Sequence, residues 1–360
     1  MRLLNNLLFV IFAMSANAAD GTVGTVSVQK GNNVSVNGEA PLSLTLDGKD
    51  HQSCQFLSKR APDESHEFTW KEVTTTRGGE LAEILGDQLR SVDSLVVKGN
   101  VNDKDFHAMW DASLYGYLSV INLKNAVLEN NAVPDTAFFH ENEQYEGSSH
   151  EIFYYIGLRK IILPEGLEKI GEGAFYQASA LRQVNFPSTL RYIGDFAFNA
   201  TKLEMNQLVI PEGVEEINQY AFAFCRKLKA QVTLPSTIKK IGEWAFYGCP
   251  ITSINLPEGL ESLGSLSFWD CDLREVSIPS SCHEFNEGWQ FGFNRNLEKM
   301  HLPEGMTEIP DHFAVDCFRL REVNFPHTLK HIGEKAFSLC ISLKNVDLPL
   351  GMQSLGEEAF

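Results

Sequence analysis

The chain has 360 residues, of which 43% are hydrophobic and 21% charged. This is the composition of a folding chain, and it excludes a collagen-like, low-complexity or wholly disordered protein. Acidic side chains outnumber basic ones by 47 to 30, and the resulting formal net charge of −17 repels phosphate backbones and anionic lipid, so we expect no nucleic-acid partner.

The first predicted element is a leader. Residues 1–18 contain one basic side chain, Arg2, then an apolar stretch over 7–14, and end with the small residues Ala16 and Ala18. This is the pattern of a secretory signal peptide. The apolar stretch is too short to span a bilayer, which takes about 20 residues, and no later segment approaches that length. We therefore expect a secreted or cell-surface protein without a transmembrane segment.

A small β-rich segment is predicted next, over residues 19–75. Residues 22–28 and 42–46 alternate apolar and polar side chains as half-buried strands do, and turn-prone stretches rich in glycine and asparagine separate them. Cys54 lies here and is expected to be a free thiol.

Residues 76–157 are predicted to hold an N-terminal cap and degenerate copies of the repeat that follows. Apolar residues recur at helical spacing over 79–92, which predicts a helix that covers the open end of the first coil. Residues 91–99 and 118–125 are interpreted as two degenerate strands of the repeat. An insertion at 141–155 then interrupts the period.

Residues 158–360 consist of a regular repeat of 22 to 24 residues, illustrated by LRQVNFPSTLRYIGDFAF at 181–198. Each copy has a proline, apolar residues three and six positions after it, usually a glycine, and then an Ala-Phe pair. Self-similarity at a fixed short period is the signature of a solenoid. The prolines of the copies are Pro164, Pro187, Pro211, Pro235, Pro257, Pro279, Pro303, Pro326 and Pro349.

A single copy cannot bury its own apolar face, so coils are expected to stack and share one core. The segment before each proline alternates as a short strand does, and proline ends the strand by removing a backbone donor. The glycine is expected to allow a tight bend, and the phenylalanines of successive coils are expected to stack on one another. Eleven strands, from residue 92 to residue 343, would make an arc of about 50 Å at about 4.8 Å per strand.

These repeats resemble the leucine-rich repeats of the BspA type, found in secreted and cell-surface bacterial proteins. The resemblance is strong over 118–360 and weaker over 76–117. It implies a curved leucine-rich repeat solenoid with parallel strands on the concave face and an irregular convex side, and it implies roles in adhesion and in binding host or matrix proteins. The last repeat is incomplete at Phe360, which suggests a truncated product or continuation in a partner.

Five cysteines stand 14 residues after the proline of their repeat, so they are expected to form a ladder. Ala178 and Phe293 occupy the same position by count, which indicates a buried apolar slot and favours free thiols over an oxidised pair or a metal site. Cys282 replaces a core leucine and is expected to be buried. The five cysteines are Cys225, Cys249, Cys271, Cys317 and Cys340.

Other candidate chemistry is sparse. Four histidines close in sequence, His301, His312, His327 and His331, fall at different phases of the coil, which disfavours a shared metal site. Enzyme signatures are absent from the sequence, so we assign no catalytic, cofactor-binding or metal-ligating residue.

One repeat departs from the pattern. Between Pro279 and Pro303 the Ala-Phe pair becomes Trp289-Gln290, and further phenylalanines lie nearby. This is interpreted as a repacked core, with an exposed binding patch as the alternative.

The candidate binding surface is the outward face of the strands. From residue 183 to 277 this face is nearly all uncharged amide and hydroxyl side chains, although the protein is acidic. The alternative is a plain solvated sheet face copied by repeat duplication. The candidate ligand-binding residues are Gln183, Asn185, Gln207, Gln231, Thr233, Asn255, Ser277, His301 and Asn324.

The sequence thus predicts a non-catalytic, surface-exposed or secreted protein that binds a protein or glycan ligand, in adhesion, without a cofactor. Two alternatives remain. The repeats could be the recognition domain of a larger enzyme or glycan-processing protein whose catalytic part lies beyond residue 360, or they could be a structural spacer that binds nothing.

Overall fold

The computed structural model describes residues 66–139 and 156–360, together with the backbone of a few strands outside these ranges. The predicted signal peptide and Cys54 lie outside the described residues, as does most of the predicted insertion at 141–155. Among the strands given by their backbone, β1 pairs with β2 and β3, and β4 pairs with β9. Their bounds are β1 (Gly24–Gln29), β2 (Asn33–Gly38), β3 (Leu44–Leu46), β4 (Gln55–Leu57) and β9 (Ile152–Tyr154).

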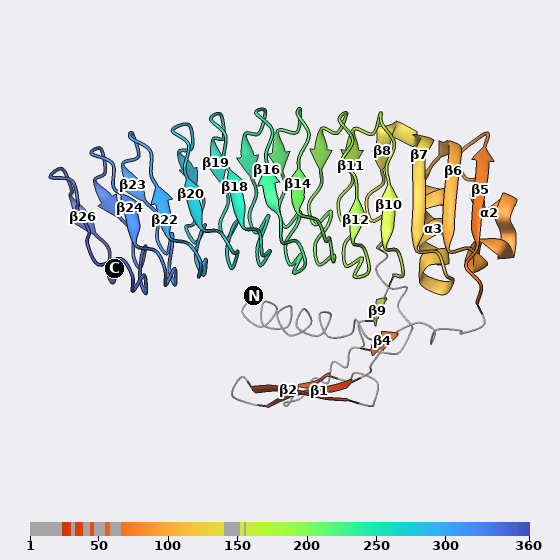
Figure 1. The fold of residues 1–360 in the computed structure, drawn as a ribbon, viewed down its shortest axis with the longest axis horizontal. Coiled ribbons are helices and arrows are strands. Elements are labelled where there is room, and N and C mark those ends of the chain that lie inside the picture. The colour runs from red at the N-terminus through yellow and green to blue at the C-terminus, as the bar shows by residue number, and fades with distance from the viewer. Residues whose placement is uncertain are drawn as a thin grey trace.

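The chain winds as a curved solenoid in which one short strand of every coil lies on the same side (Figure 1). The neighbouring strands that pair on this side do so in parallel, in sequence order and as three successive sheets. We call this side the strand face. Its strands are β5 (Trp70–Thr75), β6 (Ser94–Val101), β7 (Val120–Leu128), β10 (Lys160–Ile162), β12 (Gln183–Val184), β14 (Gln207–Val209), β16 (Gln231–Thr233), β18 (Ser253–Asn255), β20 (Glu275–Ser277), β22 (Lys299–His301) and β24 (Glu322–Asn324).

A second set of short strands follows the proline turns and stacks in the same order. Its register places the apolar residue six positions after each proline directly over its counterpart, as in Ile170 over Ile193 and Ile193 over Ile217. The strands of this set are β8 (Ala132–Val133), β11 (Lys169–Ile170), β13 (Tyr192–Ile193), β15 (Glu216–Ile217), β17 (Lys240–Ile241), β19 (Ser262–Leu263), β21 (Glu284–Phe285), β23 (Glu308–Ile309), β25 (His331–Ile332) and β26 (Ser354–Leu355).

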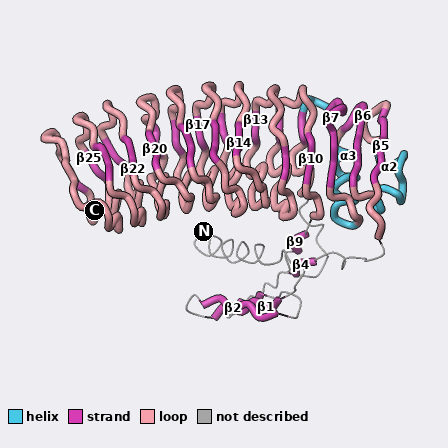
Figure 2. The backbone as a smooth tube through the Cα atoms, in the orientation of Figure 1, coloured by secondary structure: helices cyan, strands magenta, loops and turns pink. Residues whose placement is uncertain are grey.

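Helices in the described chain gather at its N-terminal end (Figure 2). The helix predicted over 79–92 is confirmed as a short α-helix followed by a 3₁₀ turn, whereas its role as a cap stays a prediction. The helix at 103–115 was not expected from the sequence. The helical elements are α2 (Leu81–Leu85), η2 (Gly86–Ser91), α3 (Asp103–Tyr115) and η3 (Glu129–Asn131).

The array starts one strand earlier than expected. The two degenerate strands predicted at 91–99 and 118–125 are confirmed as β6 and β7. However, β5 pairs in parallel with β6 and so precedes them. Residues 70–75 therefore belong to the array and not to the separate β-rich segment predicted over 19–75; α2 and η2, rather than a proline turn, follow this strand. At the other end, the strand expected at residue 343 is not formed.

A stack of phenylalanine rings runs through the core, as the repeat predicted. The rings of Phe198 and Phe222 lie 5.3 Å apart with 9° between their planes, and Phe222 and Phe246 lie 5.3 Å apart with 3° between theirs. All three side chains are fully buried. We call this stack the phenylalanine spine; it also includes Phe138, Phe175, Phe268 and Phe291.

The repeat glycine has a different role from the expected one. Gly194 is not in the left-handed region of backbone conformation, so a bend that only glycine can adopt does not explain it. A Cβ atom placed there would lie 2.6 Å from the backbone nitrogen of Glu172 in the preceding coil. The glycine is therefore needed because two backbones approach closely, and a side chain would separate the coils.

The proline turns fasten the coils together in pairs. The carboxylate of Glu212 accepts hydrogen bonds from the backbone N–H and the hydroxyl of Ser236, at 3.1 and 3.0 Å. The Thr237 hydroxyl accepts from the Gly213 N–H and donates to the Val214 carbonyl, both at 2.9 Å. Equivalent bonds join the coils that follow Pro164, Pro257 and Pro303 to the next coil along the chain. These side-chain bonds therefore link each Pro-Glu-Gly coil to the coil that follows it.

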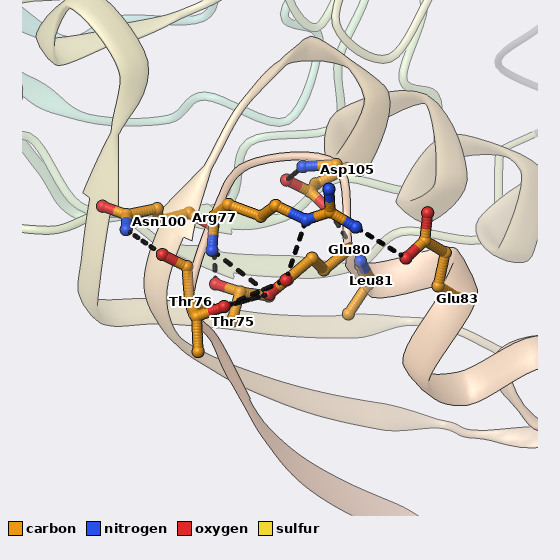
Figure 3. A network of polar contacts seen from close by, with 9 residues as sticks. Thr75, Thr76, Arg77, Glu80, Leu81, Glu83, Asn100 and Asp105 are labelled. Carbon is orange, nitrogen blue, oxygen red and sulfur yellow. Dashed lines mark hydrogen bonds and ion pairs between the residues drawn. The ribbon is translucent and has the colours of Figure 1, made fainter.

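The N-terminal helices are held by one buried carboxylate (Figure 3). Asp105 is 1% exposed and accepts hydrogen bonds from the backbone N–H groups of Gly79, Leu81 and Asn102, at 2.7, 2.9 and 2.9 Å. It thereby completes the N-terminal capping box of α3 and fixes the turn before α2. Beside it, backbone N–H groups of Thr76 and Arg77 hold the pKa of Glu80 down to about 2.

Candidate functional site

The strand face presents two rows of outward side chains. The −4 row lies four residues before each repeat proline, and the −2 row lies two residues before it. In the centre of the face Gln207 pairs with Gln231, and Gln231 pairs with Ser253. Beside them lies the aligned −2 row, formed by Val209, Thr233 and Asn255. All six side chains are exposed, and we call them the central patch.

The central patch is uncharged and offers both donors and acceptors. An amide side chain can both donate and accept hydrogen bonds, and so can a hydroxyl. Because the side chains of serine and threonine are short, they lose little conformational entropy when a ligand orders them. A shallow open pocket with a volume of about 590 Å³ lies along its edge. The residues that line this pocket are Asn206, Gln207, Lys229, Gln231 and Thr252.

The C-terminal part of the face is charged and internally paired. His301 Nε2 lies 3.0 Å from a carboxylate oxygen of Glu275. Lys299 Nζ lies 2.9 Å from Glu322, and this hydrogen-bonded pair lowers the pKa of Glu322 and raises that of Lys299. The predicted binding residue His301 is therefore engaged with its neighbour strand, whereas Ser277 beside it is exposed.

Two of the predicted binding residues bond to the neighbouring coil. The Asn185 side chain accepts a hydrogen bond from the Leu163 N–H at 2.7 Å and donates to the Leu163 carbonyl at 3.0 Å. Asn324 makes the same two bonds with Leu302, at 2.8 and 2.9 Å. These amides complete the backbone hydrogen bonding where the strands end, which periodicity alone does not reveal.

The N-terminal part of the face carries a pocket that the sequence did not indicate. It lies across β7, β10 and β12 and has a volume of about 470 Å³. The Gln183 amide stands at its edge and is exposed. Its lining residues are Lys124, Lys160, Ile161, Ile162, Leu163, Glu165, Gln183, Val184 and Asn185.

The cysteine ladder consists of buried free thiols, as predicted for the described cysteines. Each ladder thiol donates to a backbone carbonyl of the preceding coil, as Cys249 does to Phe222 at 2.9 Å. Burial raises the pKa of Cys249 well above its usual value. One prediction about this slot was wrong: Asn294 occupies it instead of Phe293, and its Nδ2 donates to the Phe268 carbonyl at 2.7 Å. The coil has an extra residue before this point, so the slot takes hydrogen-bond donors as well as apolar groups.

The four clustered histidines make separate contacts. His312 stacks on Trp289 at 3.7 Å between ring centroids, and burial lowers its pKa. His331 Nδ1 lies 2.8 Å from the Ser354 hydroxyl. In the described parts of the chain, histidine, cysteine and acidic side chains do not gather into a group that could hold a metal ion.

The irregular repeat is repacked, in agreement with the favoured prediction. Phe291 joins the phenylalanine spine and is fully buried. Phe313 meets Phe291 edge to face, with 77° between the rings, which accommodates the inverted Phe-Ala pair of the next coil. Trp289 and Phe293 lie against Trp269 on the opposite side of the coil and are partly buried.

Within residues 66–139 and 156–360, the helices are too short or too polar to cross a membrane. Comparison with protein families finds six copies of the BspA type leucine rich repeat region, over residues 148–231, 229–326 and 311–360. Comparison with curated protein sequences finds no significant match.

Solved structures similar to this chain include three leucine-rich repeat proteins. One from Bacteroides ovatus is 17% identical, with 94% of this chain and 90% of that chain covered and a TM-score of 0.41. A leucine rich cell surface protein from Faecalibacterium prausnitzii is 20% identical, with 68% and 74% covered and a TM-score of 0.34. A leucine rich repeat protein from T. pallidum is 30% identical, with 42% and 72% covered and a TM-score of 0.38.

Proposed function

Because the chain belongs to the BspA-type leucine-rich repeat family, we propose that it is a non-catalytic protein, secreted or displayed at the cell surface, that binds a macromolecular ligand on its strand face in adhesion. The observation that carries this proposal is the central patch. It is an aligned set of exposed, uncharged side chains, all of which except Val209 can form hydrogen bonds, in a protein whose net charge is −17.

Two physical arguments support binding at this place. The strands fix the patch on a stacked backbone, so little conformational entropy is lost when a ligand orders it. An extended ligand, whether peptide or glycan, can then form one set of contacts per coil. Specificity follows because a ligand that leaves these amides unpaired loses their hydrogen bonds to water without replacement.

Adding negative charge to the uncharged central patch tests this proposal. Replacing Gln207, Gln231 and Asn255 together by glutamate adds three negative charges and removes the amide donors. We expect the affinity for the ligand of the unaltered protein to fall at least tenfold. The ligand is first selected with a glycan array and a matrix-protein pull-down, and affinity is then measured by surface plasmon resonance.

A matched control adds the same charges away from the strand face, at the exposed residues Asn286, Thr307 and Gln353. This variant is expected to bind as the unaltered protein does. Equal loss in both variants would show a general charge effect, and unchanged affinity in the first variant would refute the proposal. Failure of the unaltered protein to retain any glycan or matrix protein would favour the spacer alternative.

A further inference from the structure

The pocket across β7, β10 and β12 differs chemically from the central patch. Its floor is aliphatic: Ile162 and Val184 are each partly buried, and Ile161 and Leu163 lie beneath as fully buried core residues. None of the lining residues is aromatic. The volume of about 470 Å³ lies within the range of about 300–1,000 Å³ that is typical of ligand sites.

The shape of the pocket is fixed before any ligand binds. The Asn185 amide is held by two hydrogen bonds to the Leu163 backbone, so the wall that it forms cannot rotate freely. The Glu165 carboxylate is likewise bound by the N–H and hydroxyl of Ser188, at 3.1 and 2.9 Å. Ligand binding therefore costs little conformational entropy at these two side chains.

The pocket is lined by two lysines and one glutamate, so its lining has a net positive charge. Lys124 and Lys160 line it, and neither forms an ion pair with another described residue. Two other lysines of this face are paired: Lys98 Nζ lies 2.6 Å from Glu72, and Lys299 Nζ lies 2.9 Å from Glu322. The Glu165 carboxylate keeps its charge and is hydrogen-bonded to Ser188, but the two ammonium groups outweigh it, so the pocket attracts an anionic group in an otherwise acidic protein.

We propose that this pocket binds an acidic peptide segment of a protein ligand, an inference that rests on the proposed binding function of the strand face. A carboxylate lies between the ammonium groups of Lys124 and Lys160, and an aliphatic side chain two residues along the peptide packs on Ile162 and Val184. The Gln183 amide is exposed and in reach of the peptide backbone.

The chemistry of the floor favours a peptide over an acidic glycan. Protein sites commonly hold sugars by stacking them on aromatic rings, whereas this floor is aliphatic. In an extended peptide, side chains two residues apart project from the same face about 7 Å from each other, so a carboxylate and an aliphatic side chain at such positions can both enter the pocket. Such a ligand satisfies the charge and the apolar surface together.

Fluorescence polarisation of a fluorescein-labelled peptide, Glu-Ser-Val-Ser-Glu, in which the glutamate and valine side chains share one face, tests this proposal on the full chain. We expect saturable binding that weakens as sodium chloride is raised, and at least a tenfold higher Kd in the Lys124→Gln, Lys160→Gln double variant. A matched control, Lys227→Gln with Lys330→Gln, makes the same change at exposed lysines elsewhere and should leave the Kd within twofold. The peptide Gln-Ser-Val-Ser-Gln should not bind.

Three results would overturn the proposal. They are an unchanged Kd in the Lys124, Lys160 double variant, equal binding of the glutamine peptide, and displacement of the peptide by oligogalacturonate at lower concentration than by unlabelled peptide. The variant with glutamate at residues 207, 231 and 255 separates this proposal from the broader one. If the pocket alone is wrong, that variant loses the selected ligand while the lysine variant keeps it. If the proposal for the central patch alone is wrong, the lysine variant loses the selected ligand while the glutamate variant keeps it.

Discussion

Phe222→Ala is expected to lower the free energy of unfolding by about 3–5 kcal/mol, the usual cost of truncating a buried phenylalanine. The Phe222 side chain is 0% exposed and stacks between Phe198 and Phe246, with ring centroids 5.3 Å away on each side. Its removal leaves a cavity with rings on both sides. The backbone on either side is fixed by the stacked coils, so the cavity cannot close easily.

Urea denaturation followed by circular dichroism measures this effect. The matched control is Tyr192→Ala, which removes a ring that is 42% exposed and lies 5.6 Å from the ammonium of Lys169. We expect the control to cost less than about 1 kcal/mol. A Phe222→Ala cost no larger than that of the control would mean that the rings do not form a shared core.

Asp105→Ala is expected to cost about 2–4 kcal/mol, because it leaves three backbone N–H groups without their charged acceptor in a buried place. Gly79, Leu81 and Asn102 are those donors; the first two lie in the turn before α2 and the third is the N-cap of α3. The loss should therefore loosen α2 and the start of α3 together.

Amide hydrogen exchange read by mass spectrometry locates this loss. Exchange should accelerate over residues 79–115 in the Asp105→Ala chain and remain unchanged beyond residue 181. Asp103→Ala is the control, since Asp103 lies two residues earlier in the same helical turn and is exposed. Equal acceleration in both variants would contradict the assigned role of Asp105.

The regular part of the fold could be predicted because its signal is repeated. A phenylalanine in a single copy of the repeat does not show where its ring lies. Its recurrence at the same position of successive copies indicates that the rings stack. The spine through Phe198, Phe222 and Phe246 therefore followed from spacing alone. The first strand, β5, could not be found in this way because α2 and η2, rather than a proline turn, connect it to β6.

Hydrogen bonds between side chains and the neighbouring coil could not be predicted from the spacing of the repeat. Asn185 and Asn324 were expected to face a ligand, yet their amides bond to the backbone of the neighbouring coil. The slot of Asn294 was also misplaced, because counting from the proline ignores an extra residue within the coil. In both cases the sequence indicates the residue type and its place within the repeat. The hydrogen-bond partner of the side chain depends on its exact position in space, which the sequence does not give.

The helix α3 was not predicted, although the sequence carries two signals for it. Asn102 and Asp105 form a capping box, in which the Asn102 side chain accepts a backbone hydrogen bond and Asp105 accepts one from the Asn102 N–H. The buried face that follows, with Phe106, Met109 and Trp110, has helical spacing. Read together, these residues mark a helix between two strands of the array.

The stacking of like positions underlies the spine, the strand face and both proposed binding regions, and electron paramagnetic resonance distances test it most directly. Nitroxide labels on cysteines introduced at Gln183 and Glu275, and at Gln183 and Glu322, would be measured in a chain with Cys54 replaced by serine, since the described native thiols are buried. At about 4.8 Å per strand, separations of about 19 and 29 Å are expected. Equal separations for the two label pairs, or a shorter separation for the Gln183 and Glu322 pair, would contradict the stacking of successive coils.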